Sequence, residues 1–173
     1  KGRYRDIEFR EGDAERLPFG NNLFDAVVMN FGVLHLGRPD QALAEACRVL
    51  RTDGRFAFTA WAKPEEAAGF GIVLRALAKY GDVNVSLPEG PPFFRFSDPD
   101  ECIRSLLVAG FAAPKVFKLP QFWRLPSLDS LFELMKDSTV RTAGLLQAQK
   151  PDALEKIREA IRDELKKHQK RNA

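Results

Sequence analysis

The residues of this chain that could do chemistry gather early, in the stretch FREGDAERLPFGNNLFDAVVMN from Phe9 to Asn30. Asp13 lies just past a predicted short strand, and Asn30 lies at the end of the next one. A carboxylate accepts hydrogen bonds from an amine, and the backbone N–H of the following Ala14 can donate to a ring nitrogen. Together these groups can bind the edge of an adenine. Taken alone, Asp13 is more typical of a loop residue that bonds its own backbone.

Alternating strands and helices are predicted around these residues. In chain order, the first sixty residues predict strands at Ile7–Arg10, Phe24–Phe31 and Arg55–Ala62, with a helix at about Asp40–Arg51. The Phe24–Phe31 run is apolar and Val-rich, which is typical of a strand buried on both faces of a parallel sheet. The helix is expected to end at Asp53-Gly54, with Gly54 at positive φ. Such a βαβ unit binds ligands at the carboxyl ends of its strands, so Asp13 and Asn30 can line one crevice.

The rest of the chain is predicted to be mostly helical. Helices are expected at Glu65–Tyr80, from a cap at Ser97 to Gly110, from Ser127 onward, around Val140–Gln147 and from about Pro151. The segment Pro114–Leu125 is expected to form one bent strand or two short ones, broken at Pro120. The G-x-G at Gly69–Gly71 lies inside a helical pattern and carries bulky Phe70, which favours a packing role over a cofactor loop.

Composition and charge favour a globular domain, with 45% hydrophobic residues, 29% charged residues and a net charge of +3. No apolar run reaches the roughly 18 residues that span a bilayer, and we see no secretory signal before the first predicted strand. Cys47 and Cys102 share no motif, so we expect core thiols and a reducing, cytoplasmic location. His35 and His168 lack metal-ligand spacing. The basic tail Lys166–Asn172 favours a solvated helix end over a nucleic-acid contact, because no aromatic residues interleave with its charges.

Four segments in order, GDAERLPF, FDAVV, LHL and ACRVLRTDGRFAF, resemble class I S-adenosylmethionine-dependent methyltransferases. They look most like the branch that includes the ubiquinone/menaquinone-biosynthesis methyltransferases. The resemblance covers Ile7 to about Trp61 closely and continues more loosely through Phe96–Phe111. It implies an α/β fold with a Rossmann-like sheet, mostly parallel, with a C-terminal antiparallel hairpin. It also implies a single domain over residues 1–173, with a cofactor-side βαβ core at 1–62 and helices, an acceptor-side lid and the hairpin at 63–173.

The same resemblance implies roles for individual residues, with S-adenosylmethionine as cofactor and S-adenosylhomocysteine as product. Asp13 would accept from the adenine amino group, and the Ala14 N–H would meet the ring. Asn30 and Phe31 would border the methionine part of the cofactor. His35 matches a frequent histidine at the start of the next helix, near the reactive sulfur. It is the candidate general base, although a packed histidine bonded to a backbone carbonyl is an equal alternative.

Aromatic residues beyond the predicted βαβ unit could wall an apolar pocket for a small-molecule acceptor. The candidates are Trp61, Phe93, Phe94 and Trp123, with Phe122 beside the last. For each of them taken singly, packing in a core or a sheet is the favoured alternative.

The important departure from the family lies upstream of Asp13. Family members carry a first strand and a glycine-rich turn that cradle the methionine end of the cofactor. No G-x-G pattern precedes Asp13 here, so we expect an N-terminally truncated methyltransferase. The Ile7–Arg10 strand would lack its neighbour and a central strand would have a bare edge. We therefore expect dimerisation, strand swapping or a missing N-terminal segment.

Three functions remain open at this stage. The leading hypothesis is methyl transfer to a small molecule by in-line displacement, impaired in this shortened chain. The second is a binding or scaffold domain that kept the fold and lost catalysis, which the missing glycine turn favours. A nucleic-acid methyltransferase ranks last, because the chain has no Asn-Pro-Pro-Tyr or similar base-flipping signature.

Overall fold

A computed structural model describes residues 6–87 and 90–168. The chain forms two compact units, one from residues 1–62 and 90–117 and the other from residues 63–89 and 118–173. Residues 90–117, which the sequence analysis groups with the lid, thus lie in the first unit. The assignment of the whole chain to a single domain stays a prediction. Pro88 and the end of the basic tail lie outside the described residues.

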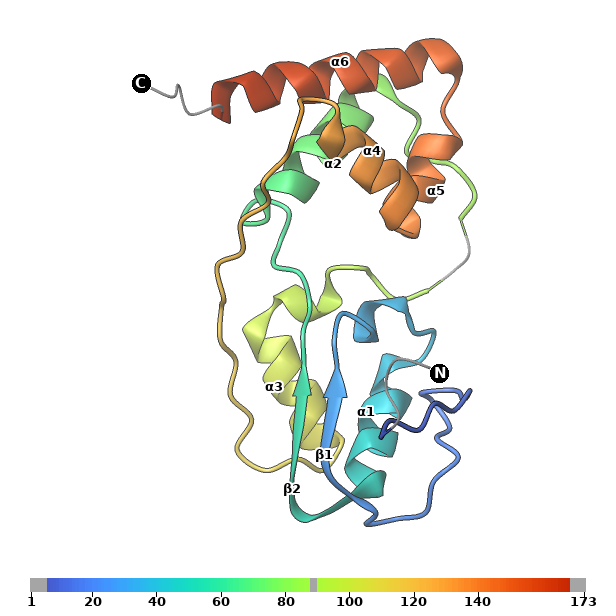
Figure 1. Ribbon diagram of the computed structural model, residues 1–173, viewed down its shortest axis with the longest axis vertical. Coiled ribbons are helices and arrows are strands. Elements are labelled where there is room, and N and C mark those ends of the chain that lie inside the picture. Colours follow the sequence, from blue (N-terminus) through green and yellow to red (C-terminus); the bar gives the residue numbers. More distant parts are fainter. Residues whose placement is uncertain (1–5, 88–89, 169–173) are drawn as a thin grey trace. The chain divides into compact units, whose positions relative to one another are not determined.

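The first unit contains a parallel βαβ motif, as predicted. Strand β1 (Phe24–Met29) pairs with β2 (Leu50–Phe58), and helix α1 (Pro39–Val49) connects them. The two arrows point the same way in Figure 1. The unit is completed by two short 3-10 helices and one α-helix, which are η1 (Val33–His35), η2 (Arg95–Ser97) and α3 (Pro99–Val108). This mixed α/β arrangement is that of a Rossmann-like sheet, here with two strands among the described residues.

The core of the first unit lies on one face of this strand pair. Its buried members come from η1, α1, η2 and α3, and they are Val33, Leu43, Phe96, Cys102 and Leu106. Met29 of β1 and Phe56 and Phe58 of β2 pack against them. The alternate residue Val28 is 74% exposed. The expectation of a strand buried on both faces is therefore wrong, because no described element covers the second face.

Two predicted strands are absent from the described residues. Residues 7–10 have no strand structure, and Ile7 and Phe9 are each 53% exposed. Residues 114–125 carry neither strand nor helix, so the antiparallel hairpin is not formed. A strand needs a ladder partner, and neither segment pairs with a neighbouring strand. Pro120 also lacks the N–H that a ladder would use.

The structure shifts two predicted boundaries. Helix α1 ends at Val49 and β2 begins at once, whereas Gly54 was expected at positive φ beyond a longer helix. Asp53 takes that conformation instead, with φ of 67°, inside an irregularity of the ladder. Aspartate tolerates this region better than most residues, which explains why the turn can form there. The cap of α3 is Asp98 and not Ser97, because the Asp98 carboxylate accepts from the Asp100 N–H at 3.0 Å.

The second unit is helical. It consists of α2 (Ala68–Tyr80), α4 (Ser130–Ser138), α5 (Arg141–Gln147) and α6 (Pro151–His168). Fully buried side chains fill it, among them Leu77, Leu131, Met135, Leu146, Ile157 and Ile161. A Cβ on Gly69 would lie 2.5 Å from the Trp123 ring, and one on Gly71 would strike the Pro64 carbonyl. The predicted packing role of this G-x-G is therefore confirmed. No helix in the described ranges is both long and apolar enough to cross a membrane.

Candidate functional site at the carboxyl ends of the strands

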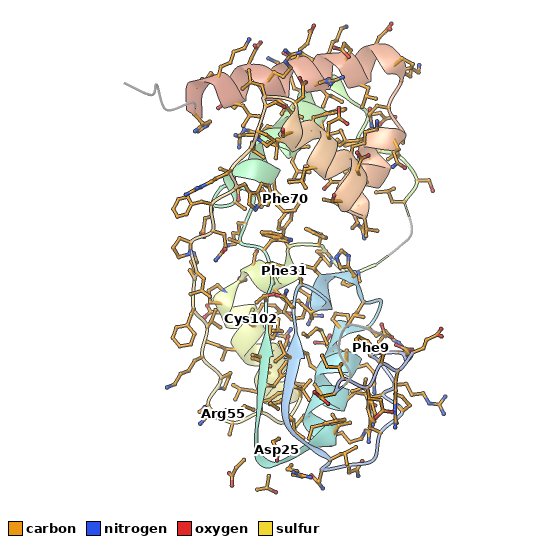
Figure 2. The ribbon with its side chains drawn as sticks, in the orientation of Figure 1. Phe9, Asp25, Phe31, Arg55, Phe70 and Cys102 are labelled. Carbon is orange, nitrogen blue, oxygen red and sulfur yellow. The ribbon has the colours of Figure 1, made fainter. Side chains whose placement is uncertain are left out.

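The carboxyl ends of β1 and β2 are joined by side-chain hydrogen bonds. The Thr59 hydroxyl donates to Asn30 Oδ1 at 2.7 Å and accepts from the Phe31 N–H at 2.9 Å. The Thr59 N–H donates to the Met29 carbonyl at 3.1 Å. Figure 2 shows Phe31 at this end of the strand pair and Asp25 at the opposite end. The structure thus shows Asn30 and Phe31 at the carboxyl end of β1, as predicted, and this is the edge at which parallel sheets bind ligands.

Phe31 has an uncommon backbone conformation. Its φ is 50°, in the left-handed region that glycine adopts readily and aromatic residues rarely do. Its ring stacks on Trp61, with centroids 4.3 Å apart and planes 24° from parallel. Such outliers cost about 1–3 kcal/mol and cluster at functional sites. An aromatic pair therefore lies directly beside the strand ends.

Asp13 lies in a tight turn and makes the local bonds of an Asx turn. Its carboxylate Oδ1 accepts from the Glu15 N–H at 2.8 Å, and its carbonyl accepts from the Arg16 N–H at 3.0 Å. Asp13 therefore makes the local backbone bonds that are typical of a loop aspartate. The carboxylate is exposed and has a second oxygen that this turn does not use. A role in ligand binding is compatible with this geometry, since each carboxylate oxygen accepts more than one bond.

Glu15 attaches this turn to the start of α1. Its carboxylate accepts from the backbone N–H of Arg38 at 2.7 Å and from the Arg38 Nε at 2.8 Å, and its side chain is only 11% exposed. These hydrogen bonds lower the pKa of Glu15 below its usual range. The carboxylate is thus held ionised by its partners, and its function is to position the Asp13 turn.

A second group of hydrogen bonds holds the loop between the Asp13 turn and β1. The Glu45 carboxylate accepts from the Leu17 N–H at 2.8 Å and from the Arg48 guanidinium. Arg48 in turn donates to the carbonyls of Leu17 and Phe19. These bonds lower the pKa of Glu45 and raise that of Arg48. Helix α1 therefore fixes the loop that leads from the candidate adenine contact to the strand.

His35 ends η1, and α1 begins four residues later at Pro39, so the expected location at the start of the next helix is wrong by one short turn. The imidazole ring lies edge-on to Phe93, with centroids 6.1 Å apart, and Phe93 packs against Phe94 at 4.9 Å. His35 is exposed, so this contact does not bury the ring, and both interpretations of His35 stay predictions. The contact places Phe93 beside the candidate base.

Each of the four aromatic residues predicted for an acceptor pocket has a described ring contact. Trp61 stacks on Phe31, and Phe93 pairs with both His35 and Phe94. Trp123 belongs to the second unit, where its ring lies 6.2 Å from Phe70 on α2. The structure thus brings Trp61 to the strand ends and gives Trp123 a packing role on α2.

Sequence reasoning missed Thr59 and Arg38. Thr59 follows a strand-forming run, and a β-branched hydroxyl residue looks like one more strand position. The available signal was the hydroxyl of Thr59, which can bridge two groups. The predicted strand ran on to Ala62, so the sequence did not place residue 59 at a strand end. Arg38 gave no comparable signal, because it bonds to Glu15 across a loop and a strand, and the spacing of apolar residues says nothing about such a contact.

Comparisons with known proteins find methyltransferases. Residues 1–58 match the methyltransferase domain family. A demethylmenaquinone methyltransferase of Renibacterium salmoninarum is 42% identical over 64 residues, which are 37% of this chain and 27% of that protein. A ubiquinone/menaquinone biosynthesis C-methyltransferase of Brucella canis is 48% identical over 56 residues, 32% of this chain and 21% of that protein. A protein of the same name from Francisella tularensis is 41% identical over 64 residues, 37% of this chain and 26% of that protein.

The chain therefore spans only about a quarter of the length of the curated relatives it matches. No solved structure matches it. The looser resemblance expected over Phe96–Phe111 lies beyond the family match, and it stays a prediction. Over residues 1–58, by contrast, the expected resemblance is confirmed: this segment is similar to class I S-adenosylmethionine-dependent methyltransferases of the ubiquinone/menaquinone-biosynthesis branch.

Proposed function

We propose that this chain carries part of the active site of a methyltransferase that moves a methyl group from S-adenosylmethionine to a small-molecule acceptor. One observation carries the proposal. Asn30, Phe31, Thr59 and Trp61 meet at the carboxyl ends of two parallel strands, inside or directly after the segment that matches the methyltransferase domain. Ligands of open α/β sheets bind at this edge.

The donors and acceptors present suit the cofactor. The exposed Asp13 carboxylate can accept from the adenine amino group, and the Ala14 N–H can donate to the ring. The bond to Thr59 uses the Asn30 oxygen, so Asn30 offers its amide N–H donors to a ligand oxygen. Phe31 provides an apolar wall beside Asn30. When bound, S-adenosylmethionine supplies the electrophilic methyl group, and the protein's task is to align it with the acceptor.

The acceptor side is less complete. We propose that Trp61, Phe93 and Phe94 line an apolar acceptor pocket, with His35 next to Phe93 as the group that takes a proton where the acceptor must lose one. The assignment of Trp123 to the same pocket stays a prediction. A cytoplasmic location and pairing of two chains through the bare edge of β1 are proposals of the same standing.

The second candidate function is a non-catalytic binding or scaffold domain with the same fold. The engagement of Asp13 in its own Asx turn favours this candidate, because a carboxylate that serves the turn needs no ligand.

Calorimetric titration with S-adenosylhomocysteine distinguishes the two functions. We expect binding to the wild-type chain and about tenfold weaker binding to Asp13→Asn, which keeps the turn-forming Oδ1 and loses the charge; tenfold corresponds to roughly 1.4 kcal/mol. Asp25→Asn is the matched control, since Asp25 is an exposed carboxylate at the other end of β1. Absence of binding, or equal loss in both variants, would favour the scaffold.

A further inference from the structure

The end of β1 holds a conformation that its own sequence does not favour. Phe31 has a φ of 50°, although an L-residue with a large side chain loses roughly 1–2 kcal/mol in this region. Gly32 follows directly, and would have adopted the same conformation without strain. Something outside residues 30–32 must therefore stabilise the strained form of Phe31.

Thr59 makes the contacts that can do this. Its hydroxyl accepts from the Phe31 N–H at 2.9 Å and at the same time donates to Asn30 Oδ1 at 2.7 Å. A hydroxyl has one proton to donate, so Asn30 takes it and the lone pairs serve Phe31. One side chain directly after β2 thus fixes two consecutive residues after β1.

Both fixed groups face the proposed ligand edge. The bond to Thr59 orients the Asn30 amide through its oxygen, and both amide N–H donors are left to a ligand. The bond to the Phe31 N–H holds the left-handed turn that brings the Phe31 ring onto Trp61, with centroids 4.3 Å apart. A change at Thr59 alone would disturb the amide and the ring together.

We propose that Thr59 is a positioning residue, whose hydroxyl orients the Asn30 amide and the Phe31–Trp61 stack so that the site accepts a ligand bearing an oxygen acceptor next to an apolar group. The identity of the ligand rests on the proposed function. The two hydrogen bonds of Thr59 with Asn30 and Phe31, called the clamp below, do not depend on it, because they are made within the chain. A threonine that served only to staple β1 to β2 would need neither bond with residues 30 and 31, since its backbone N–H already bonds Met29.

Fluorine NMR of protein labelled with 5-fluorotryptophan tests the clamp without any ligand. The chain has two tryptophans, so two resonances are expected, which Trp61→Phe and Trp123→Phe variants assign. In Thr59→Val, which keeps the shape and loses the hydroxyl, we expect the Trp61 resonance to shift or broaden while the Trp123 resonance stays in place. Thr59→Ser, which keeps the hydroxyl, should restore the Trp61 resonance. Thr59→Ala provides a second hydroxyl-free variant if Val does not fold, a failure that would move both resonances.

Two spectral outcomes would overturn the clamp. One is an unchanged Trp61 resonance in the folded hydroxyl-free variants. The other is a Thr59→Ser spectrum as altered as that of Thr59→Val, since the methyl group and not the hydroxyl would then matter.

Ligand binding gives the second readout. With S-adenosylhomocysteine, we expect Thr59→Val to bind about tenfold more weakly than wild type and Thr59→Ser to bind within about twofold of it. Asn30→Asp should lose affinity at least as much, because it can still accept from Thr59 but no longer donates to the ligand. Equal affinity of Thr59→Val and wild type would refute the positioning role. If wild type itself does not bind, the proposed function fails, while the tryptophan resonances still decide whether Thr59 forms the clamp.

Discussion

At the scale of single residues, one strained backbone position lies where the chemistry is proposed. Four described non-glycine residues have positive φ, and they are Asn22, Phe31, Asp53 and Ala113. Asparagine and aspartate visit this region readily, whereas an aromatic residue does not. The sequence pattern could identify Asn30 and Phe31 as the end of a strand. It could not reveal the strain at Phe31, because the strained conformation depends on a hydrogen bond from the Phe31 N–H to Thr59, which follows a different strand.

The strain at Phe31 predicts an unusual order of stability. Phe31→Gly should be more stable than Phe31→Ala by about 1 kcal/mol, because both lose the ring but only glycine adopts this φ without cost. At exposed Val28 in the middle of β1, the order should reverse, since glycine is unfavourable within a strand. Urea denaturation of the four variants measures both differences. Alanine as the more stable residue at position 31 would show that no left-handed strain exists there.

The two cysteines differ in environment, and the difference predicts their reactivity. Cys102 is buried in the core of the first unit, and burial, with the nearby Asp98 and Glu101, raises the pKa of its thiol to about 11. At pH 8 very little thiolate is present, so Cys102 should react with a thiol reagent such as iodoacetamide only after unfolding. Mass spectrometry of the native chain should find label at the partly exposed Cys47 first. Rapid native labelling of Cys102 would contradict the packing described.

At the scale of elements, prediction succeeded where the pattern is local and repeated. The βαβ unit and the five α-helices beyond it appear where the apolar spacing predicts them, with ends shifted by a few residues. The strands at 7–10 and 114–125 failed for a common reason. A strand depends on a partner that lies elsewhere in the chain, and local propensity cannot supply it. Val28 shows the same limit, because an apolar pattern does not tell whether a second layer covers it.

Contacts between elements of the first unit depend on Arg95. Its guanidinium donates to both oxygens of Asp40 on α1 at 2.7 and 2.8 Å and to Glu101 on α3 at 2.6 Å. The side chain is 19% exposed, and these partners raise its pKa. Hydrogen bonds to Arg95 lower the pKa of Asp40, and those to Arg104 and Arg95 lower that of Glu101. The network therefore couples three segments of the unit, and its strength depends on the ionisation of two carboxylates.

This network predicts how stability varies with pH. The folded-state pKa values of both carboxylates lie below their ordinary values of 3.8 and 4.5, so their contribution is present above those values and is lost as the pH falls through the lower, folded-state ones. Arg95→Met should lower the free energy of unfolding by about 1–3 kcal/mol at pH 7. Between pH 5 and pH 3, the free energy of unfolding of this variant should fall by less than that of wild type. Urea unfolding at several pH values, followed by the fluorescence of Trp61 and Trp123, measures both effects.

Arg51→Met is the control for this experiment. Arg51 pairs with Asp25 at 2.7 Å, but both side chains are more than half exposed, and exposed pairs contribute little. A loss in Arg51→Met equal to that in Arg95→Met would show that the Arg95 network has no special weight. Parallel pH profiles of Arg95→Met and wild type would show that the two carboxylates are not what makes stability depend on acidity.

At the scale of the whole molecule, the chain order does not follow the compact units. The second unit is built from residues 63–89 and 118–173, and Gln149 joins its parts by exchanging hydrogen bonds with the backbone of Asp82 at 2.7 and 2.8 Å. Composition and periodicity gave no domain boundary. A unit assembled from separate segments is recognised only from contacts such as this one, which join residues far apart in sequence.

The family resemblance is unevenly distributed over the same molecule. It covers residues 1–58, whereas the segments of the second unit lie outside the family match. We therefore propose that cofactor binding belongs to the first unit. The residues proposed to carry it are Asp13 and Ala14 in the turn, Asn30 and Phe31 after β1, and Thr59 and Trp61 after β2.

The most direct test of this assignment is a titration of the isotopically labelled chain with S-adenosylhomocysteine, followed by amide NMR. Even weak binding near 1 mM, about −4 kcal/mol, is detectable in this way. The account predicts shifts at the amides of Ala14, Asn30, Phe31 and Thr59, with the amides of α6 unchanged. No shift at saturating ligand, or shifts confined to residues 63–89 and 118–173, would contradict a cofactor site at the carboxyl ends of β1 and β2.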